Sequence, residues 1–262
     1  MSDLVIREIV KGTILTFSKP FKRMGIVPIG GRSTAIKLSD SSVWLLASTP
    51  LTDETRQQID QLGPVKSAHQ SPHHSTNKIP NLCNLNSNRF IAVADMEHTG
   101  FITQYTDAYP EAKVYGPEGV AKKLGINVHE WTSDKNHNPM EYDTQVLKDE
   151  IKAEYFDGFI NKDIAFLHVP ELASNFTSWF GTLSPDSKIH QRFVYNLAAT
   201  NKTSMAHSAY KVDQWDFDRI IPCHGDVIDT GGKEAWRKTY SLYFDDIKNG
   251  KFPGIGTSSK AQ

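Results

Sequence analysis

The sequence predicts a layered α/β fold, because segments with strand and helix patterns alternate through both halves of the chain. Several of the expected strands are short and apolar, and three of them run directly into a histidine or an acidic residue. The chain has 262 residues, of which 39% are hydrophobic, and this is enough to bury a large core. We expect a single domain over residues 1–253 and a disordered tail over residues 254–262.

The first half is expected to contain a β-hairpin followed by a helix. Residues 33–38 and 43–47 have strand character and are joined by a polar turn at 39–42, which is typical of a hairpin. The helix is expected over Asp53–Leu62, because Thr52 is a good N-cap residue and Gly63 and Pro64 stop a helix. The other elements expected here are a strand over 91–94, a helix over 99–109, a strand at 114–115 and a helix over 117–124.

The second half repeats the alternation of strands and helices. Residues 154–168 are rich in strand formers, and Ile164, Phe166 and His168 share one face of an extended strand. A final buried strand is expected over Arg219–Pro222. The helices expected in this half cover residues 176–199, 206–215 and 233–248.

Charge and cysteine content narrow the range of partners. The 29 basic and 30 acidic residues are spread along the chain, so neither nucleic acid nor an anionic membrane is expected as a partner. No apolar run approaches the roughly 20 residues of a membrane helix, and no signal peptide is recognised. Cys83 and Cys223 form no CxxC pair, which favours the reducing cytoplasm. We expect a small-molecule substrate, and the oligomeric state is left open.

Residues 67–89 differ in kind from the rest, because they show neither a helical nor a strand period. We expect this segment to be a disordered insertion. It contains the densest histidine cluster, His69, His73 and His74, and tracts of this kind can bind metal. Partners that would orient these rings are scarce in such a loop, so adventitious affinity is the preferred interpretation.

Two further histidines stand at strand ends. His224 follows the apolar strand Arg219–Pro222 and precedes Gly225, which lets the backbone turn away sharply. His168 ends the strand-rich segment at 154–168. A single histidine at a strand end is more often structural than functional. A functional role for His168 and His224 therefore needs support from other candidate ligands.

An acidic segment at the end of the strand over 91–94 contains further candidate ligands. It holds Asp95, Glu97 and His98, and imidazole and carboxylate groups are the ligands that zinc and similar ions take in catalytic sites. The alternative is a helix N-terminus at which Asp95 caps the helix, Glu97 complements its dipole and His98 is a surface residue. The sequence has no GxSxG elbow, GxGxxG fingerprint or P-loop, so those chemistries are not expected.

These segments together resemble a fungal family of metallo-β-lactamase-like proteins of unknown function. The resemblance runs from about Val27 to about Phe244, and its last stretch is the most specific. The matching stretches are 27–38 (VPIGGRSTAIKL), 48–55 (STPLTDET), 95–98 (DMEH), 108–113 (AYPEAK), 159–168 (FINKDIAFLH) and 215–226 (WDFDRIIPCHGD).

The resemblance implies an αββα sandwich with the site at the open edge between its two sheets. The wider superfamily places a zinc-type site on an HxHxDH loop, a histidine after a later strand, a bridging aspartate and a final histidine. His168 and His224 fall on the second and last of these positions. In the first loop, Val93, Asp95, Glu97 and His98 stand where the motif has His, His, Asp and His.

The chain departs from the family pattern in two places. After Pro170 the strand that carries the bridging aspartate is not recognised, so we expect that strand to be missing. Residues 67–89 look like an insertion between Lys66 and the strand that begins near Phe90. Loss of the bridging aspartate predicts one metal ion at most.

The resulting hypothesis is a metal-dependent hydrolase. Zinc or another divalent transition metal would be held by His98, His168 and His224, with Asp95 and Glu97 as acidic catalytic groups. Asp226 would orient His224 from behind. The substrate bond would be an ester, thioester, lactone or phosphoester. The alternatives are a non-catalytic scaffold with a degenerate site and a binding module that uses the cleft without metal.

Overall fold

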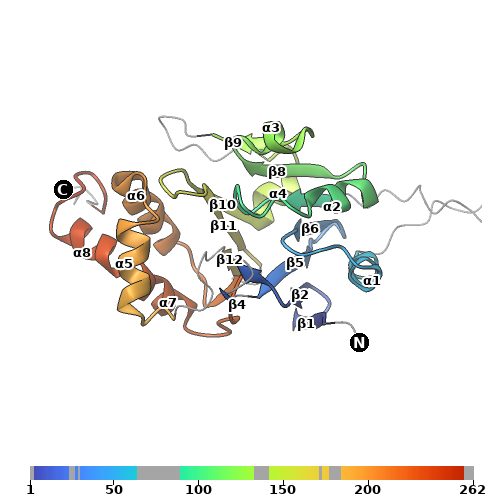
Figure 1. The fold of residues 1–262 in the computed structure, drawn as a ribbon, viewed down its shortest axis with the longest axis horizontal. Coiled ribbons are helices and arrows are strands. Elements are labelled where there is room, and N and C mark those ends of the chain that lie inside the picture. Colours follow the sequence, from blue (N-terminus) through green and yellow to red (C-terminus); the bar gives the residue numbers. More distant parts are fainter. Residues whose placement is uncertain are drawn as a thin grey trace, which may run out of the picture.

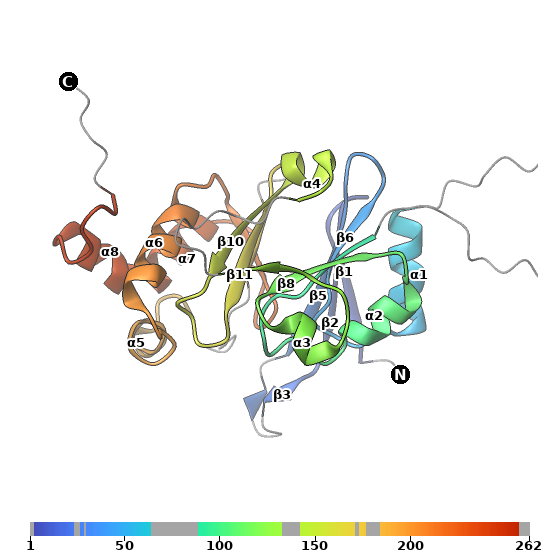
Figure 2. The ribbon, with the colours of Figure 1, turned by 90° about the horizontal axis from the view of Figure 1, so that it is seen from above.

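The computed structural model confirms the α/β class and shows four layers (Figures 1 and 2). Two sheets face each other, with helices on both outer faces. The structure describes residues 3–23, 27–28, 30–63, 89–132, 142–170, 173–176 and 184–256. The expected insertion therefore lies outside the described residues, apart from Arg89, which is buried at the start of a strand. The end of the expected tail, residues 257–262, also lies outside them.

The larger sheet comes from the first half of the chain. It has seven strands in the order β1(Val5–Val10), β2(Ile14–Lys19), β5(Gly31–Lys37), β6(Val43–Leu46), β7(Arg89–Ala92), β8(Lys113–Pro117) and β9(His129–Trp131). The pairs from β1 to β6 are antiparallel and those from β6 to β9 are parallel. A small ribbon of β3(Lys22–Arg23) and β4(Val27–Pro28) extends the β2–β5 hairpin.

The smaller sheet comes from the second half and corrects one expectation. Its order is β10(Ile151–Phe156), β11(Asp163–His168), β12(Ala173–Phe176) and β13(Arg219–Pro222). A strand, β12, therefore does follow His168, and it fills the place between β11 and β13. β11 and β12 are antiparallel whereas β12 and β13 are parallel, so β11 and β13 run in opposite directions.

Alternate residues of the inner strands enter different cores, as the strand period of two requires. In β6, Trp44 and Leu46 pack between the two sheets, whereas Val43 and Leu45 pack toward the first-half helices. In β11, Ile164 and Phe166 enter the inter-sheet core, and the residues between them, Ala165 and Leu167, pack against the second-half helices. Strands buried on both faces explain why the sequence shows short apolar runs here.

Helices cover the outer face of each sheet. The first sheet carries α1(Asp53–Leu62), α2(Ile102–Ala108) and α3(Val120–Leu124), and α4(Gln145–Glu150) precedes β10. The second sheet carries α5(Lys188–Asn196), α6(Lys202–Asp213), α7(Gly232–Thr239) and α8(Ser241–Lys248) (Figure 2). Within the described part of the chain, no helix is both long and apolar enough to span a membrane.

Several expected elements were right and others need correction. The β5–β6 hairpin, α1 and β13 are confirmed. The helix expected over 176–199 was too long, because residue 176 ends β12 and the helix α5 begins at Lys188. The helix expected over 233–248 is two helices, which meet at Tyr240. Ile255, placed in the expected tail, is buried in the core of the second-half helices.

Replacing Thr52 by alanine should lower the free energy of unfolding by about 0.5–2 kcal/mol, the usual cost of losing an N-cap. Thr52 Oγ1 accepts the backbone N–H of Thr55 at 3.1 Å at the start of α1. Urea unfolding followed by circular dichroism would measure the change. Thr52→Ser keeps the hydroxyl acceptor and should be close to neutral, and an equal loss in both variants would contradict the cap.

Candidate active site

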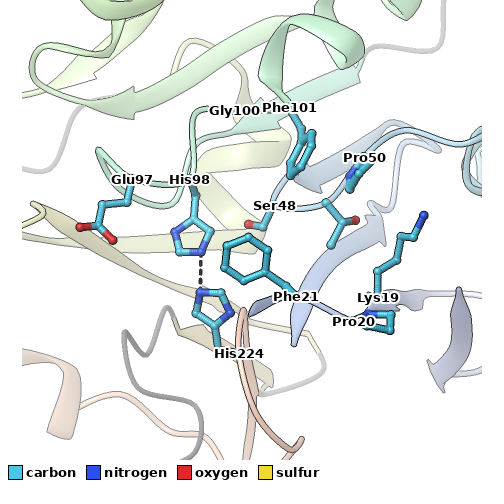
Figure 3. Close-up of a pocket in the computed structure, with 12 residues that line it drawn as sticks. Lys19, Pro20, Phe21, Ser48, Pro50, Glu97, His98, Gly100, Phe101 and His224 are labelled. Atoms are coloured by element: carbon cyan, nitrogen blue, oxygen red, sulfur yellow. Dashed lines mark hydrogen bonds between the residues drawn. The ribbon is translucent and has the colours of Figure 1, made fainter. Parts of the chain in front are cut away.

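His98 and His224 meet at one edge of the sandwich (Figure 3). Of the three predicted histidine ligands, these two lie furthest apart in the chain. His98 lies in the loop between β7 and α2, and His224 follows β13. Their Nε2 atoms are 2.8 Å apart. The ring centroids are 4.8 Å apart with the planes tilted by 40°. The site therefore joins a loop of the first sheet to a strand end of the second.

Asp95 holds the His98 ring through its Nδ1 atom. Its carboxylate accepts the backbone N–H groups of Glu97 at 2.6 Å and of His98 at 2.8 Å, and the ring N–H at Nδ1 of His98 at 2.6 Å. The Asp95 side chain is fully buried. Burial alone would raise the pKa of this carboxyl, but attraction to His98 and the hydrogen bonds from it hold the pKa below its usual value. Asp95 therefore holds both the backbone and the ring of His98.

A backbone carbonyl fixes the His224 ring in the same way. Nδ1 of His224 lies 2.6 Å from the oxygen of Gly30, and because a carbonyl can only accept, this ring nitrogen donates. Gly30 has φ of 65°, in the left-handed region that favours glycine, so the backbone turns its carbonyl here at little cost. Phe21 stacks on His224 with ring centroids 6.0 Å apart and the planes within 18°.

The two anchored rings point their Nε2 atoms at each other. Both Nδ1 atoms carry hydrogen, since each faces an acceptor, so the Nε2 atoms of neutral rings would turn lone pairs toward each other. At 2.8 Å that arrangement is repulsive unless a proton or a metal ion lies between the nitrogens. A histidine that binds metal through one nitrogen and donates the other N–H to a carboxylate or carbonyl has the usual arrangement of a metal ligand.

A pocket of about 650 Å³ opens beside the histidine pair. This volume is in the range of small-molecule sites. Figure 3 shows Phe21 next to the two rings and Phe101 further along, near Pro50. The residues that line it are Lys19, Pro20, Phe21, Gly31, Ser48, Thr49, Pro50, Glu97, His98, Gly100, Phe101 and His224. The aromatic and proline side chains make most of this surface apolar.

We expected His98, His168 and His224 to bind one metal ion together. His168 does not lie with the other two histidines, so this prediction is wrong for His168. β11 runs opposite to β13. His168, the last residue of β11, therefore lies at the opposite end of the strands from His224. His168 is buried there, with Nε2 3.7 Å from a carboxylate oxygen of Glu150. Five residue steps of about 3.3 Å place it about 17 Å from the beginning of the same strand.

The two remaining predicted residues have different surroundings. Glu97 is exposed and is among the residues that line the pocket, and its catalytic role stays a prediction. Asp226 was expected to orient His224, but the carbonyl of Gly30 holds that ring instead. The Asp226 carboxylate acts on Arg32, whose pKa burial lowers and whose charged form Asp226 helps to stabilise.

The histidine pair offers two donors to a metal ion, which is fewer than the three protein ligands of a usual catalytic zinc site. No group of three or more histidine, cysteine, aspartate or glutamate residues within the described part of the chain is arranged to hold a metal. His98 and His224 would be two of its ligands, and water or substrate would complete the shell.

Sequence reasoning did not find the partners that hold the two rings in place. The Gly30 carbonyl belongs to the backbone and has no side-chain signal in the sequence. Phe21 and Phe101 face the pocket from segments that gave no motif. Tertiary packing alone brings these groups together.

The fold is that of metallo-β-lactamases of known structure. A metallo-β-lactamase from Erythrobacter litoralis with β-mercaptoethanol in its active site superposes with a TM-score of 0.61 and 16% identity, over 94% of this chain and 98% of that one. FIM-1 from Pseudomonas aeruginosa in its mono-zinc form gives 0.56 and 13%, over 93% and 96%. The enzyme from Pontibacter korlensis gives 0.54 and 11%, over 92% and 99%. The sequence matches no protein-family model and no curated protein.

Proposed function

We propose that this protein is a metal-dependent hydrolase that binds one divalent transition-metal ion through His98 and His224. The observation that carries the proposal is the pair of Nε2 atoms facing each other while both Nδ1 atoms donate to fixed acceptors. This arrangement turns one ring nitrogen of each histidine toward a shared position, as two ligands of one cation would. The fold supports the proposal, because solved structures that share it include a mono-zinc metallo-β-lactamase.

The pocket favours substrates with an apolar group next to an ester, thioester or lactone bond. Its walls carry Phe21, Phe101 and two prolines, which would bury an aliphatic or aromatic group. Of the described residues that line the pocket, Lys19 is the one with a permanent positive charge. A phosphoester site needs several donors around its anionic oxygens, so we place phosphoesters last.

The chain's own residues would carry the following roles. A divalent metal at the histidine pair would supply a water activated near neutral pH and would polarise the substrate carbonyl. Glu97 lines the same pocket, and it would take up the proton of a water that attacks the carbonyl carbon. The same proton then passes to the departing alkoxide or thiolate. Asp95 and Gly30 hold the two rings throughout.

A metal-independent binding module is the second candidate. The observation that favours it is the incomplete ligand shell among the described residues, beside a pocket large enough for a small molecule. Such a module would bind an apolar ligand equally well with and without a chelator present.

The test is metal analysis and hydrolysis by protein purified without a histidine tag. We expect close to one equivalent of metal, and hydrolysis of p-nitrophenyl esters and acyl thioesters that rises with acyl length and stops on chelation. Glu97→Gln should lose hydrolysis and keep the metal. Protein that holds no metal, gains no activity with added zinc, cobalt, manganese or iron, and still binds apolar ligands would contradict the hydrolase and support the binding module.

A further inference from the structure

Ser48 places a hydroxyl group on the wall of the pocket, close to the strand end that carries His224. It follows the last residue of β6 by two positions and lines the pocket. Its Oγ lies 3.4 Å from Sγ of Cys223, the residue before His224. Figure 3 shows the Ser48 hydroxyl pointing toward the side of the pocket on which the His98 ring lies. This hydroxyl therefore lies at the end of the pocket where the two histidines meet.

Of the described residues that line the pocket, Ser48 and Thr49 are the two with hydroxyl side chains. The Thr49 hydroxyl belongs to a buried network, because its Oγ1 lies 2.7 Å from Oγ of Ser33. Its methyl group lies on the side of Gly31, where an added Cβ would come within 3.4 Å of it. Gly31 itself lines the pocket, so Thr49 turns its methyl group to this wall. Ser48 is the hydroxyl that a ligand can reach.

The Ser48 hydroxyl has a weak partner that a ligand can replace. Sulfur takes part only weakly in hydrogen bonds, whereas a carbonyl oxygen is a strong acceptor. The backbone N–H of Ser48 donates to Ser33 Oγ at 2.9 Å, so the chain here is held in place before a ligand arrives. Ser48 is 8% exposed, and little water competes for it. The charged donor of the pocket, Lys19, lies away from the two histidine rings in Figure 3.

We propose that Ser48 is a specificity residue of the pocket: its hydroxyl donates a hydrogen bond to the carbonyl oxygen of a ligand whose apolar part packs beside Phe21. The inference deepens the proposed function and rests on it for the identity of the reacting bond, since an ester, thioester or lactone presents such an oxygen. In hydrolysis the hydrogen bond would strengthen as negative charge develops on this oxygen. The pocket then selects carbonyl compounds over hydrocarbons of the same shape.

Binding of two inert ligands to metal-free protein tests the proposal. Acetophenone and cumene have nearly the same shape, and cumene has a methyl group where acetophenone has its carbonyl oxygen. In NMR titrations with a chelator present, Ser48→Ala should weaken acetophenone binding about 5–10-fold, the worth of one hydrogen bond, and should leave cumene binding unchanged. Ser48→Thr keeps the hydroxyl and should keep the preference for acetophenone.

Ser208→Ala is the matched control for loss of a buried hydroxyl. Ser208 is buried in α6, and its Oγ donates to the carbonyl of Tyr155 at a weak 3.4 Å. This variant should bind both ligands like the native protein. Equal losses for acetophenone and cumene in Ser48→Ala would show that Ser48 acts only through packing and would overturn the proposal. Unchanged acetophenone binding in Ser48→Ala would overturn it too, as would native protein that binds neither ligand.

The infrared carbonyl band of bound acetophenone, isotope-labelled at its carbonyl group, gives a second measurement. A hydrogen bond lowers the frequency of this band, so the band should lie lower in native protein than in an apolar solvent. Ser48→Ala should move it back, and Ser48→Gly serves the same purpose if Ser48→Ala does not fold. A band in native protein at the apolar-solvent frequency would overturn the proposal.

These measurements separate this inference from the proposed function, because neither ligand can be hydrolysed and no metal is present. Protein that hydrolyses no ester and binds no zinc, but prefers acetophenone through Ser48, would refute the hydrolase and leave the inference standing. Protein that hydrolyses esters in a metal-dependent way, but shows no effect of Ser48→Ala on acetophenone binding, would overturn the inference alone.

Discussion

Alanine in place of His98 or His224 is expected to weaken zinc binding by more than about 100-fold. Removing a group that only supports a ligand costs 10–100-fold, and here one of two imidazole donors is lost. A single remaining imidazole does not retain a divalent ion against water and buffer. Calorimetric titration of apoprotein with zinc measures this directly, and the native protein should show no more than one tight site.

Three other variants give this experiment its controls. His168→Ala should bind zinc like the native protein, because His168 lies at the far edge of the second sheet beside Glu150. His129→Ala changes an exposed ring that stacks on Tyr115 and should also leave binding unchanged. Asp95→Ala should weaken binding without abolishing it. Tight zinc binding that survives both His98→Ala and His224→Ala would show that the metal site lies elsewhere.

Phe166→Ala is expected to lower the free energy of unfolding by about 3–5 kcal/mol. The ring is 1% exposed and meets Trp44 edge-on with centroids 4.9 Å apart, and Trp131 edge-on at 5.7 Å. Its removal would leave a cavity between the two sheets, where both tryptophans are themselves held by neighbours and cannot collapse into the space. Urea unfolding followed by tryptophan fluorescence would report the change.

The matched control is Phe21→Ala. Phe21 is 45% exposed, so its loss should change stability by no more than about 0.5 kcal/mol. A loss below about 1 kcal/mol for Phe166→Ala would show that the inter-sheet core repacks more freely than its burial indicates.

Local signals in the sequence predicted the elements that local interactions determine. Thr52 and Gly63 bound α1 in the chain and in the structure, because cap and stop residues act within one turn. The hairpin at β5 and β6 follows from two apolar runs around a short polar turn. The acidic segment after β7 was also recognised, since Asp95 and His98 are only three residues apart.

These local signals could not predict how strands distant in the sequence pair or in which direction they run. His168 and His224 both follow apolar strands, and nothing in either strand tells in which direction it runs relative to the other. Only the pairing of β11 with β12 and of β12 with β13 places the two histidines at opposite ends of the strands. The strand β12 was missed because its four residues, ASNF, lack an alternating apolar pattern.

The facing imidazoles have a thermodynamic consequence for the whole molecule. One ring belongs to the half of the chain that forms the larger sheet, and the other to the half that forms the smaller sheet. Any ion or ligand that bridges them binds only when the two halves are docked, so occupancy and docking are linked equilibria. At a free concentration 100 times its dissociation constant, such a ligand adds about 2.7 kcal/mol to the stability of the docked state. The cell's supply of that ligand would then help to set the fraction of the protein that is folded.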